Sequence, residues 1–90
     1  MKQKIEIVLK IQETIEELSL GNVPAKQISP ENRLIADLGL DSLDFATVML
    51  TVEKWSGIKI KEDLVNWSAV QTVDQLAALF EEHQSHEPNS

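Results

Sequence analysis

The sequence predicts an all-α protein, a small four-helix bundle of three main helices and one short helix, with a long loop between the first two. Apolar residues recur at helical spacing in three separate segments of the 90-residue chain. Residues 58–61 alternate like a strand, but a lone strand has no partner, so an extended linker is expected there. Since the length suits one domain, we expect the bundle at residues 1–83 and a flexible polar tail at residues 84–90.

The first helix is expected from residue 2 to about residue 18. Ile7, Ile11, Ile15 and Leu18 are spaced four, four and three residues apart, which is the period of one helix face. Gly21 then suits the end of the helix. Three further apolar residues are expected to widen the buried stripe: Ile5, Val8 and Leu9.

Residues 21–40 form the long connection, and loops of this length are uncommon in compact domains unless they are functional. Within it, Ser29-Pro30-Glu31 predicts a single helical turn, with the serine as cap and the proline at the first position. The expected anchors of the loop in the core are Ile28, Leu34, Ile35 and Leu38.

The second helix is expected at residues 42–55, ended by Ser56-Gly57. Asp41 is a good N-cap, and Asp44 in the first turn complements the helix dipole. Leu43 and Leu50 fall outside the apolar stripe, together with Thr47 and Lys54, so both leucines are expected to face outward. The stripe assigned to the core is Phe45, Val48, Met49, Val52 and Trp55.

Two shorter helical segments complete the predicted bundle. Residues 62–67 predict the short helix, with Leu64, Val65 and Trp67 turned inward. Thr72 and Gln75 have the spacing of a capping box that opens the last helix. The apolar residues of that helix are Val73, Leu76, Ala77, Leu79 and Phe80.

The composition excludes several classes of function. Fifteen acidic against eight basic residues give a net charge of −7, which repels nucleic acid and favours partners with basic surfaces. Residues 34–53 hold four acids and no lysine or arginine, which is consistent with simple solubility or with a docking face.

No apolar run approaches a membrane span and no signal peptide opens the chain, so a cytoplasmic location is expected. Without cysteine, any thiol chemistry needs a thiol from outside the sequence.

The most informative stretch is residues 38–44, Leu-Gly-Leu-Asp-Ser-Leu-Asp, which places Ser42 at a helix start behind a glycine turn. A nucleophilic serine needs a base within hydrogen-bond reach, and the two histidines, His83 and His86, lie in or beside the polar tail. A helix start does offer unpaired N–H groups and a positive dipole end to a phosphate. Ser42 is therefore interpreted as an attachment point and not as a catalytic residue.

Metal and nucleotide sites are poorly supported. Asp37, Asp41 and Asp44 do not match a calcium loop, and His83 and His86 near a chain end are expected to be solvated, so no metal ligand is assigned. The chain also lacks a glycine-rich phosphate loop. A helical adaptor that binds a protein partner through Leu43 and Leu50, without modification, remains an alternative.

The chain resembles the acyl carrier proteins over nearly its full length. The resemblance is carried by Asp41-Ser42-Leu43, by the Asp37-Leu38-Gly39 before it, and by the long loop, the acidity and the helix start at Thr72-Val73. It implies that Ser42, flanked by Asp41 and Leu43, bears a 4′-phosphopantetheine arm. That arm would come from coenzyme A through a phosphopantetheinyl transferase, and its thiol would hold acyl groups as thioesters. A non-enzymatic carrier is implied, and a monomer is the default expectation for a small acidic protein, although the sequence leaves the oligomeric state open.

The resemblance also implies partners, namely an acyl- or aminoacyl-loading ligase and acyl-processing enzymes with basic docking patches. Carried onto this sequence, the docking face comprises Asp41, Leu43, Asp44, Thr47, Leu50 and Glu53.

The chain departs from the fatty-acid type of carrier at three positions. Thr47 and Lys54 stand where acids are usual, and Ser56 replaces a frequent phenylalanine. These changes favour a specialised pathway, of polyketide or aminoacyl type, over primary fatty-acid synthesis, which remains the alternative.

Overall fold

The computed structural model describes residues 2–84. Within that range it contains helices and no named strand, and the long loop separates the first two α-helices. The predicted all-α class is therefore confirmed. The elements in chain order are α1 (Lys4–Leu18), the 3-10 turn η1 (Ala25–Gln27), α2 (Ser42–Ser56), the 3-10 turns η2 (Glu62–Leu64) and η3 (Trp67–Ala69), and α3 (Val73–Glu82).

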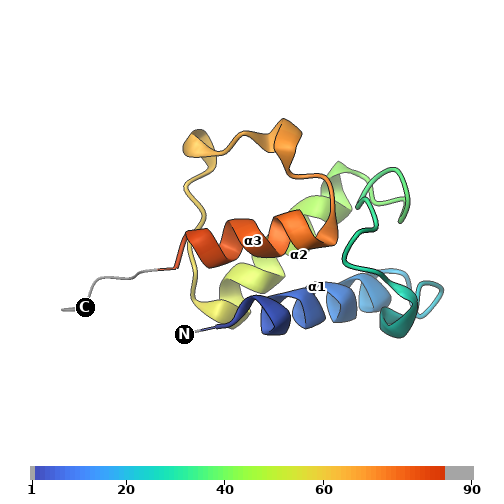
Figure 1. Cartoon of the computed structure of the whole chain (residues 1–90). Coiled ribbons are helices and arrows are strands. Elements are labelled where there is room, and N and C mark those ends of the chain that lie inside the picture. Colours follow the sequence, from blue (N-terminus) through green and yellow to red (C-terminus); the bar gives the residue numbers. More distant parts are fainter. Residues whose placement is uncertain (1, 85–90) are drawn as a thin grey trace.

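Helix α1 is the centre of the bundle. It packs against both α2 and α3, whereas α2 and α3 make far less contact with each other. α1 and α3 run in opposite directions (Figure 1), and the described ends of the chain meet. There the Lys2 backbone N–H donates to Gln84 Oε1 at 2.7 Å, and Gln84 Nε2 donates to the Lys2 carbonyl at 2.7 Å. Gln84, the first residue of the predicted tail, is thus bonded to the N-terminal segment, and residues 85–90 lie outside the described residues.

The face of α1 that enters the core is narrower than predicted. Ile7, Ile11 and Ile15 are fully buried and Val8 nearly so, which confirms the stripe. Ile5 and Leu9 were expected to widen it, and this prediction is wrong because both side chains are exposed. The reason is geometric, since a position two residues from Ile7 is rotated by about 200° and faces away from α2 and α3.

Helix α3 is buried and capped as predicted. The five apolar residues predicted for its core face are all buried, with Phe80 the largest fully buried side chain. Thr72 Oγ1 accepts from the Gln75 N–H at 3.0 Å, and Gln75 Oε1 accepts from the Thr72 N–H at 3.0 Å. This reciprocal cap confirms the helix start expected from sequence.

The loop between α1 and α2 differs from the prediction in two places. The helical turn predicted at Ser29-Pro30-Glu31 is wrong, since the 3-10 turn of the loop is η1. The segment from Ser29 instead makes a β-turn, in which the Asn32 N–H donates to the Ser29 carbonyl. Leu34 is buried as expected, and its N–H donates to the Gln71 carbonyl at 2.8 Å. Ile35 was predicted to be an anchor, but it is exposed, because the bond at Leu34 turns the following side chain to solvent.

Residues 57–72 arch from the end of α2 to the start of α3 (Figure 1). Ile58 and Ile60 are buried in an extended segment, as expected for a linker. The predicted short helix takes the form of the two separate turns η2 and η3. Leu64 was expected inside, but this prediction is wrong because its side chain is exposed. The continuous helix over residues 62–67 that would have turned it inward does not form, and Leu64 ends the single turn η2.

Candidate functional site: a presented serine beside an open groove

Ser42 is the first residue of α2, and its side chain is exposed. Gly39 adopts a left-handed backbone conformation, with φ of 74°, which few other residues reach without strain. This turn lets Leu40 enter the core, and the Leu40 N–H donates to the Leu34 carbonyl at 3.1 Å. The chain therefore arrives at Ser42 from an anchored loop, and the hydroxyl is held at the surface by rigid neighbours.

The cap of α2 is formed by the two aspartates around Ser42. Asp41 Oδ1 accepts from the Asp44 N–H at 2.8 Å, and Asp44 Oδ2 accepts from the Asp41 N–H at 3.5 Å. The Phe45 N–H donates to the Asp41 carbonyl at 2.9 Å. Within residues 2–84, the N–H groups of Ser42 and Leu43 have no hydrogen-bond acceptor. These two amides and the helix dipole suit a phosphate esterified to Ser42.

One ion pair steadies the loop before the site. The Arg33 N–H donates to Asp37 Oδ2 at 2.7 Å, and the guanidinium lies 3.5 Å from Asp37 Oδ1. The backbone hydrogen bond from Arg33, followed by the hydrogen bonds and charge of its guanidinium, lowers the pKa of the Asp37 carboxyl below its ordinary value. Because Asp37 is paired in this way, the negative charge around Ser42 comes mainly from Asp41 and Asp44.

Within residues 2–84, the histidine and acidic side chains are not gathered around Ser42 as a catalytic or metal centre would need. His83 caps the far end of α3, where its Nδ1 lies 3.0 Å from the Leu79 carbonyl, and α2 begins at the opposite end of the bundle (Figure 1). His86 lies outside the described residues. Among residues 2–84, no group of three or more acidic or histidine side chains could hold a metal ion, and no helix is long and apolar enough to span a bilayer.

The residues expected to form a docking face all lie on α2 or its cap. Leu43 and Leu50 are 74% and 53% exposed, so the prediction that both leucines face outward is confirmed. Thr47 is half-buried, and its hydroxyl donates to the Leu43 carbonyl at 3.0 Å. Glu53 is also half-buried, and its Oε2 accepts from the Ile60 N–H at 3.1 Å. The structure thus presents two apolar side chains among acids on one helix.

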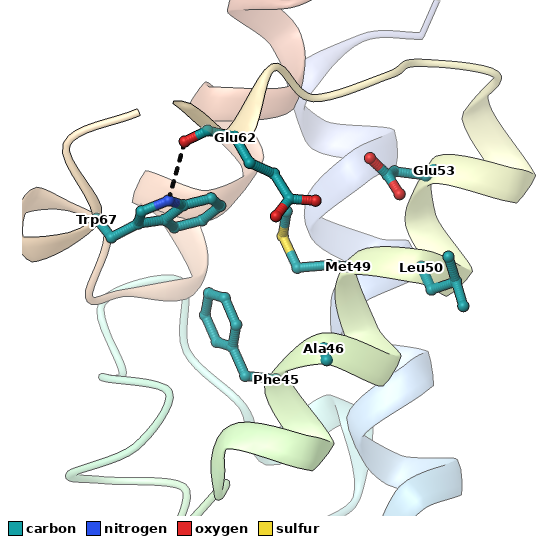
Figure 2. Close-up of a pocket in the computed structure, with 7 residues that line it drawn as sticks. All are labelled: Phe45, Ala46, Met49, Leu50, Glu53, Glu62 and Trp67. Atoms are coloured by element: carbon teal, nitrogen blue, oxygen red, sulfur yellow. Dashed lines mark hydrogen bonds between the residues drawn. The ribbon is translucent and has the colours of Figure 1, made fainter. Parts of the chain in front are cut away.

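A groove that sequence reasoning did not anticipate lies between α2 and the arch at residues 57–72. Figure 2 shows the aromatic pair at its side: Phe45 and Trp67 meet edge to face, with ring centroids 6.0 Å apart. Trp67 Nε1 donates to the Glu62 carbonyl at 3.2 Å, which fixes the indole (Figure 2). The cavity measures about 410 Å³ and is lined by Phe45, Ala46, Met49, Leu50, Glu53, Glu62 and Trp67.

Phe45 and Trp67 also border a second hollow of about 330 Å³, on the loop side of the pair. Phe45 was assigned to the core and Trp67 was expected to turn inward, but both rings are half-buried and pack against the edge of the core. The position of Phe45 one turn after Ser42 could have indicated this role. The residues around Trp67 could not have indicated its place at the groove, because that place depends on the path of the arch.

An exposed serine at the start of α2, beside two N–H groups that have no acceptor in the described residues, is an arrangement that suits a covalently attached phosphate group. The family described as "Phosphopantetheine attachment site" matches residues 10–80. The chain belongs to this family, that of the acyl carrier proteins, whose members bear a covalent 4′-phosphopantetheine.

The curated relatives of this chain are themselves acyl carrier proteins. It is 41% identical to the acyl carrier protein AcpXL of Rhizobium meliloti (strain 1021) over 51 residues, 57% of this chain and 52% of the relative. It is 38% identical to the acyl carrier protein MbtL of Mycolicibacterium paratuberculosis (strain ATCC BAA-968 / K-10) over 42 residues, 47% of each chain. The match to the meromycolate extension acyl carrier protein of Mycobacterium bovis (strain ATCC BAA-935 / AF2122/97) is 27% over 85 residues, 94% of this chain and 70% of the relative. The matched part thus spans about half the length of the first two relatives.

Proposed function

We propose that Ser42 carries the 4′-phosphopantetheine arm and that the chain delivers acyl or aminoacyl thioesters to partner enzymes. The observation that carries this proposal is the exposed hydroxyl of Ser42 at the start of α2, beside two N–H groups without an acceptor in the described residues. The arm, when bound, supplies a thiol that activates an acyl group as a thioester. The protein itself holds the phosphate end and restricts the cargo to the vicinity of α2, which raises its effective concentration at a partner.

The partners in this proposal dock on the face of α2 around Ser42. A phosphopantetheinyl transferase, a loading ligase and acyl-processing enzymes would each meet exposed leucine side chains surrounded by carboxylates. Basic patches on these enzymes complement such a face, since charge complementarity guides encounter and selects partners. We assign this face to Asp41, Leu43, Asp44, Thr47, Leu50 and Glu53. We further propose a cytoplasmic monomer with its carrier bundle at residues 1–83 and a polar tail at residues 84–90.

The attachment site is tested by intact mass. The apo protein is incubated with coenzyme A and a phosphopantetheinyl transferase of broad specificity, and we expect a single adduct. Ser42→Ala should abolish the adduct completely, and Ser68→Ala is the matched control because Ser68 is an exposed serine in the turn η3 and not at the start of an α-helix. An unchanged mass in the parent chain, or an adduct that survives Ser42→Ala, would contradict the assignment and favour an unmodified adaptor.

We also propose that the carrier serves a specialised pathway and not primary fatty-acid synthesis. Thr47 and Lys54 reduce the acidic character of α2, and Lys54 is exposed. The relatives named AcpXL, MbtL and meromycolate extension carrier support this proposal. Thr47→Glu with Lys54→Glu should increase the rate at which primary fatty-acid enzymes use the loaded carrier. A parent chain that already matches the double variant would refute this part and favour the primary pathway.

A further inference from the structure

The two tryptophans of this chain lie in opposite electrostatic surroundings. Trp55, at the end of α2, already has two cations over its ring, with Lys2 Nζ 4.5 Å and Lys10 Nζ 5.9 Å from the centroid. In the part of the chain that the structure describes, no cation lies over Trp67. The indole of Trp67 instead borders the 410 Å³ groove, with its N–H already bonded to the Glu62 carbonyl. Its ring therefore remains available to a cation brought by a ligand.

The charged groups of that groove are all acidic. Of its seven lining residues two are glutamates and none is a lysine or arginine. Between residues 2 and 84 the ion pairs join Lys4 to Asp74 and Arg33 to Asp37, so neither Glu53 nor Glu62 has a cationic partner. Figure 2 shows the Glu62 carboxylate above the thioether of Met49, with Glu53 to the other side of the same opening.

One oxygen of the Glu53 carboxylate is held in place by a hydrogen bond from the arch. Glu53 Oε2 accepts from the Ile60 N–H at 3.1 Å, which ties the end of the glutamate to the arch and leaves Oε1 without a partner in residues 2–84. An apolar floor lowers the local dielectric, so an unpaired carboxylate above it attracts a cation more strongly than it would in bulk water. The floor in this groove is formed by Phe45, Ala46, Met49 and Leu50.

The groove lies within reach of a group tethered to Ser42. Phe45 is about one helical turn after Ser42, and Glu53 is about 16 Å along the axis at 1.5 Å per residue. This span equals that of about five extended residues, which is the scale of a pantetheine chain. A tethered acyl group can thus enter the groove without any change in the backbone of α2.

We propose that this groove selects a cargo with an apolar side chain and an ammonium group, that is, an aminoacyl thioester, and this inference rests on the proposed function of Ser42. The apolar carbons of the cargo would cover Met49 and Phe45, and the ammonium would lie between Glu53, Glu62 and the face of Trp67. The same carboxylates disfavour an acyl group that carries its own carboxylate. The groove thereby distinguishes the aminoacyl class from the neutral and dicarboxylic classes.

The test compares three arms on Ser42 that differ in one group. Leucyl, 4-methylpentanoyl and isobutylmalonyl pantetheine analogues are attached through a stable amide, so that the same skeleton carries an ammonium, a hydrogen or a carboxylate. At pH 6.5 we expect the leucyl form to melt about 2–4 °C above the 4-methylpentanoyl form, the effect of a weak ion pair in a domain of this size. The isobutylmalonyl form should melt lowest. The NMR signal of the Trp67 indole N–H should shift for the leucyl arm, while that of Trp55 stays in place.

Two charge-removing variants and a control locate the effect. Glu62→Gln and Glu53→Gln should each reduce the difference between the leucyl and 4-methylpentanoyl forms by about half. Asp63→Asn should leave it unchanged, since Asp63 is an exposed acid beside Glu62 that does not line the groove. Equal melting of the two forms, or a difference that persists in both glutamine variants, overturns the inference while the adduct on Ser42 stands. A chain that accepts no arm overturns both proposals, and intact mass shows this before any melting experiment.

Discussion

The two sides of α2 differ in how completely they are covered. On the side facing α1, Val48 and Val52 are fully buried in the core. On the side facing residues 57–72, Phe45 and Trp67 are half-buried, and a cavity of about 410 Å³ lies beside them. One helix therefore contributes both to the closed core and to the open groove, and the difference lies in what packs against it.

The covering segments explain this difference. Helix α1 offers a regular row of side chains that can interdigitate with those of α2 at the density of a protein interior. The arch has only the single turns η2 and η3 and offers no such row, so hollows remain. Where few apolar contacts hold a segment, local opening costs less free energy, which suits the role that we propose for the groove.

The largest expected effect concerns the closed side. Ile11→Ala should lower the free energy of unfolding by about 2–5 kcal/mol, because Ile11 is fully buried in α1 and the cavity cannot refill. Ile5→Ala in the same helix is the control, and its exposed side chain should cost no more than about 0.5 kcal/mol. Urea unfolding of both variants measures the contrast. Equal losses would mean that the two faces of α1 are not distinct.

A smaller effect is expected on the open side. Trp67→Ala should cost about 1–2 kcal/mol, since the ring is only half-buried and loses one edge-to-face contact and one hydrogen bond. A double-mutant cycle with Phe45→Ala should give a coupling of about 0.5–1.5 kcal/mol. A coupling near zero would show that the two rings do not act as a pair in solution.

The helix cap at the site should contribute about 1 kcal/mol, no more than the packing of Trp67 on the open side. Asp41→Ala removes the acceptor of the Asp44 N–H, whereas Asp41→Asn keeps an oxygen there and should retain most of the stability. Thermal unfolding of both variants tests this. If Asp41→Asn is as unstable as Asp41→Ala, the aspartate acts through its charge and not through the hydrogen bond.

The smallest effect concerns the acid side of the stability curve. Because hydrogen bonds from Arg33 lower the pKa of Asp37 in the folded state, its contribution is present above the ordinary aspartate pKa of about 3.9 and is lost as pH falls through the lowered value. Asp37→Asn should therefore flatten the decline of stability below about pH 4. An NMR titration of the Asp37 carboxyl measures the pKa directly, and a value at or above the ordinary one would contradict the pairing.

Local patterns predicted most of the helical framework. The capping box at Thr72 and the i, i+4 series through Ile7, Ile11 and Ile15 depend on neighbours within one or two turns, and both were correct. The exposure of Ser42 could also be predicted from its neighbours, since the glycine turn and the helix cap that present it are formed by residues 39–44. The errors at Ile35 and Leu64 fall in irregular segments, where side-chain direction has no period.

The groove could not be predicted for the same reason. Phe45 and Trp67 are more than twenty positions apart, and only the path of the arch brings their rings to 6.0 Å. The orientation of Glu53 likewise depends on a hydrogen bond from Ile60, a residue beyond the end of α2.

The amino-acid sequence by itself determined the helices, their caps and the exposed position of the Ser42 hydroxyl, because these depend on short-range periodicity and on backbone preferences of a few residues. Only the tertiary structure decided that one side of α2 is sealed and the other hollow. That outcome is set by how an irregular connection packs on a regular helix, and such packing depends on shape and volume across the whole chain.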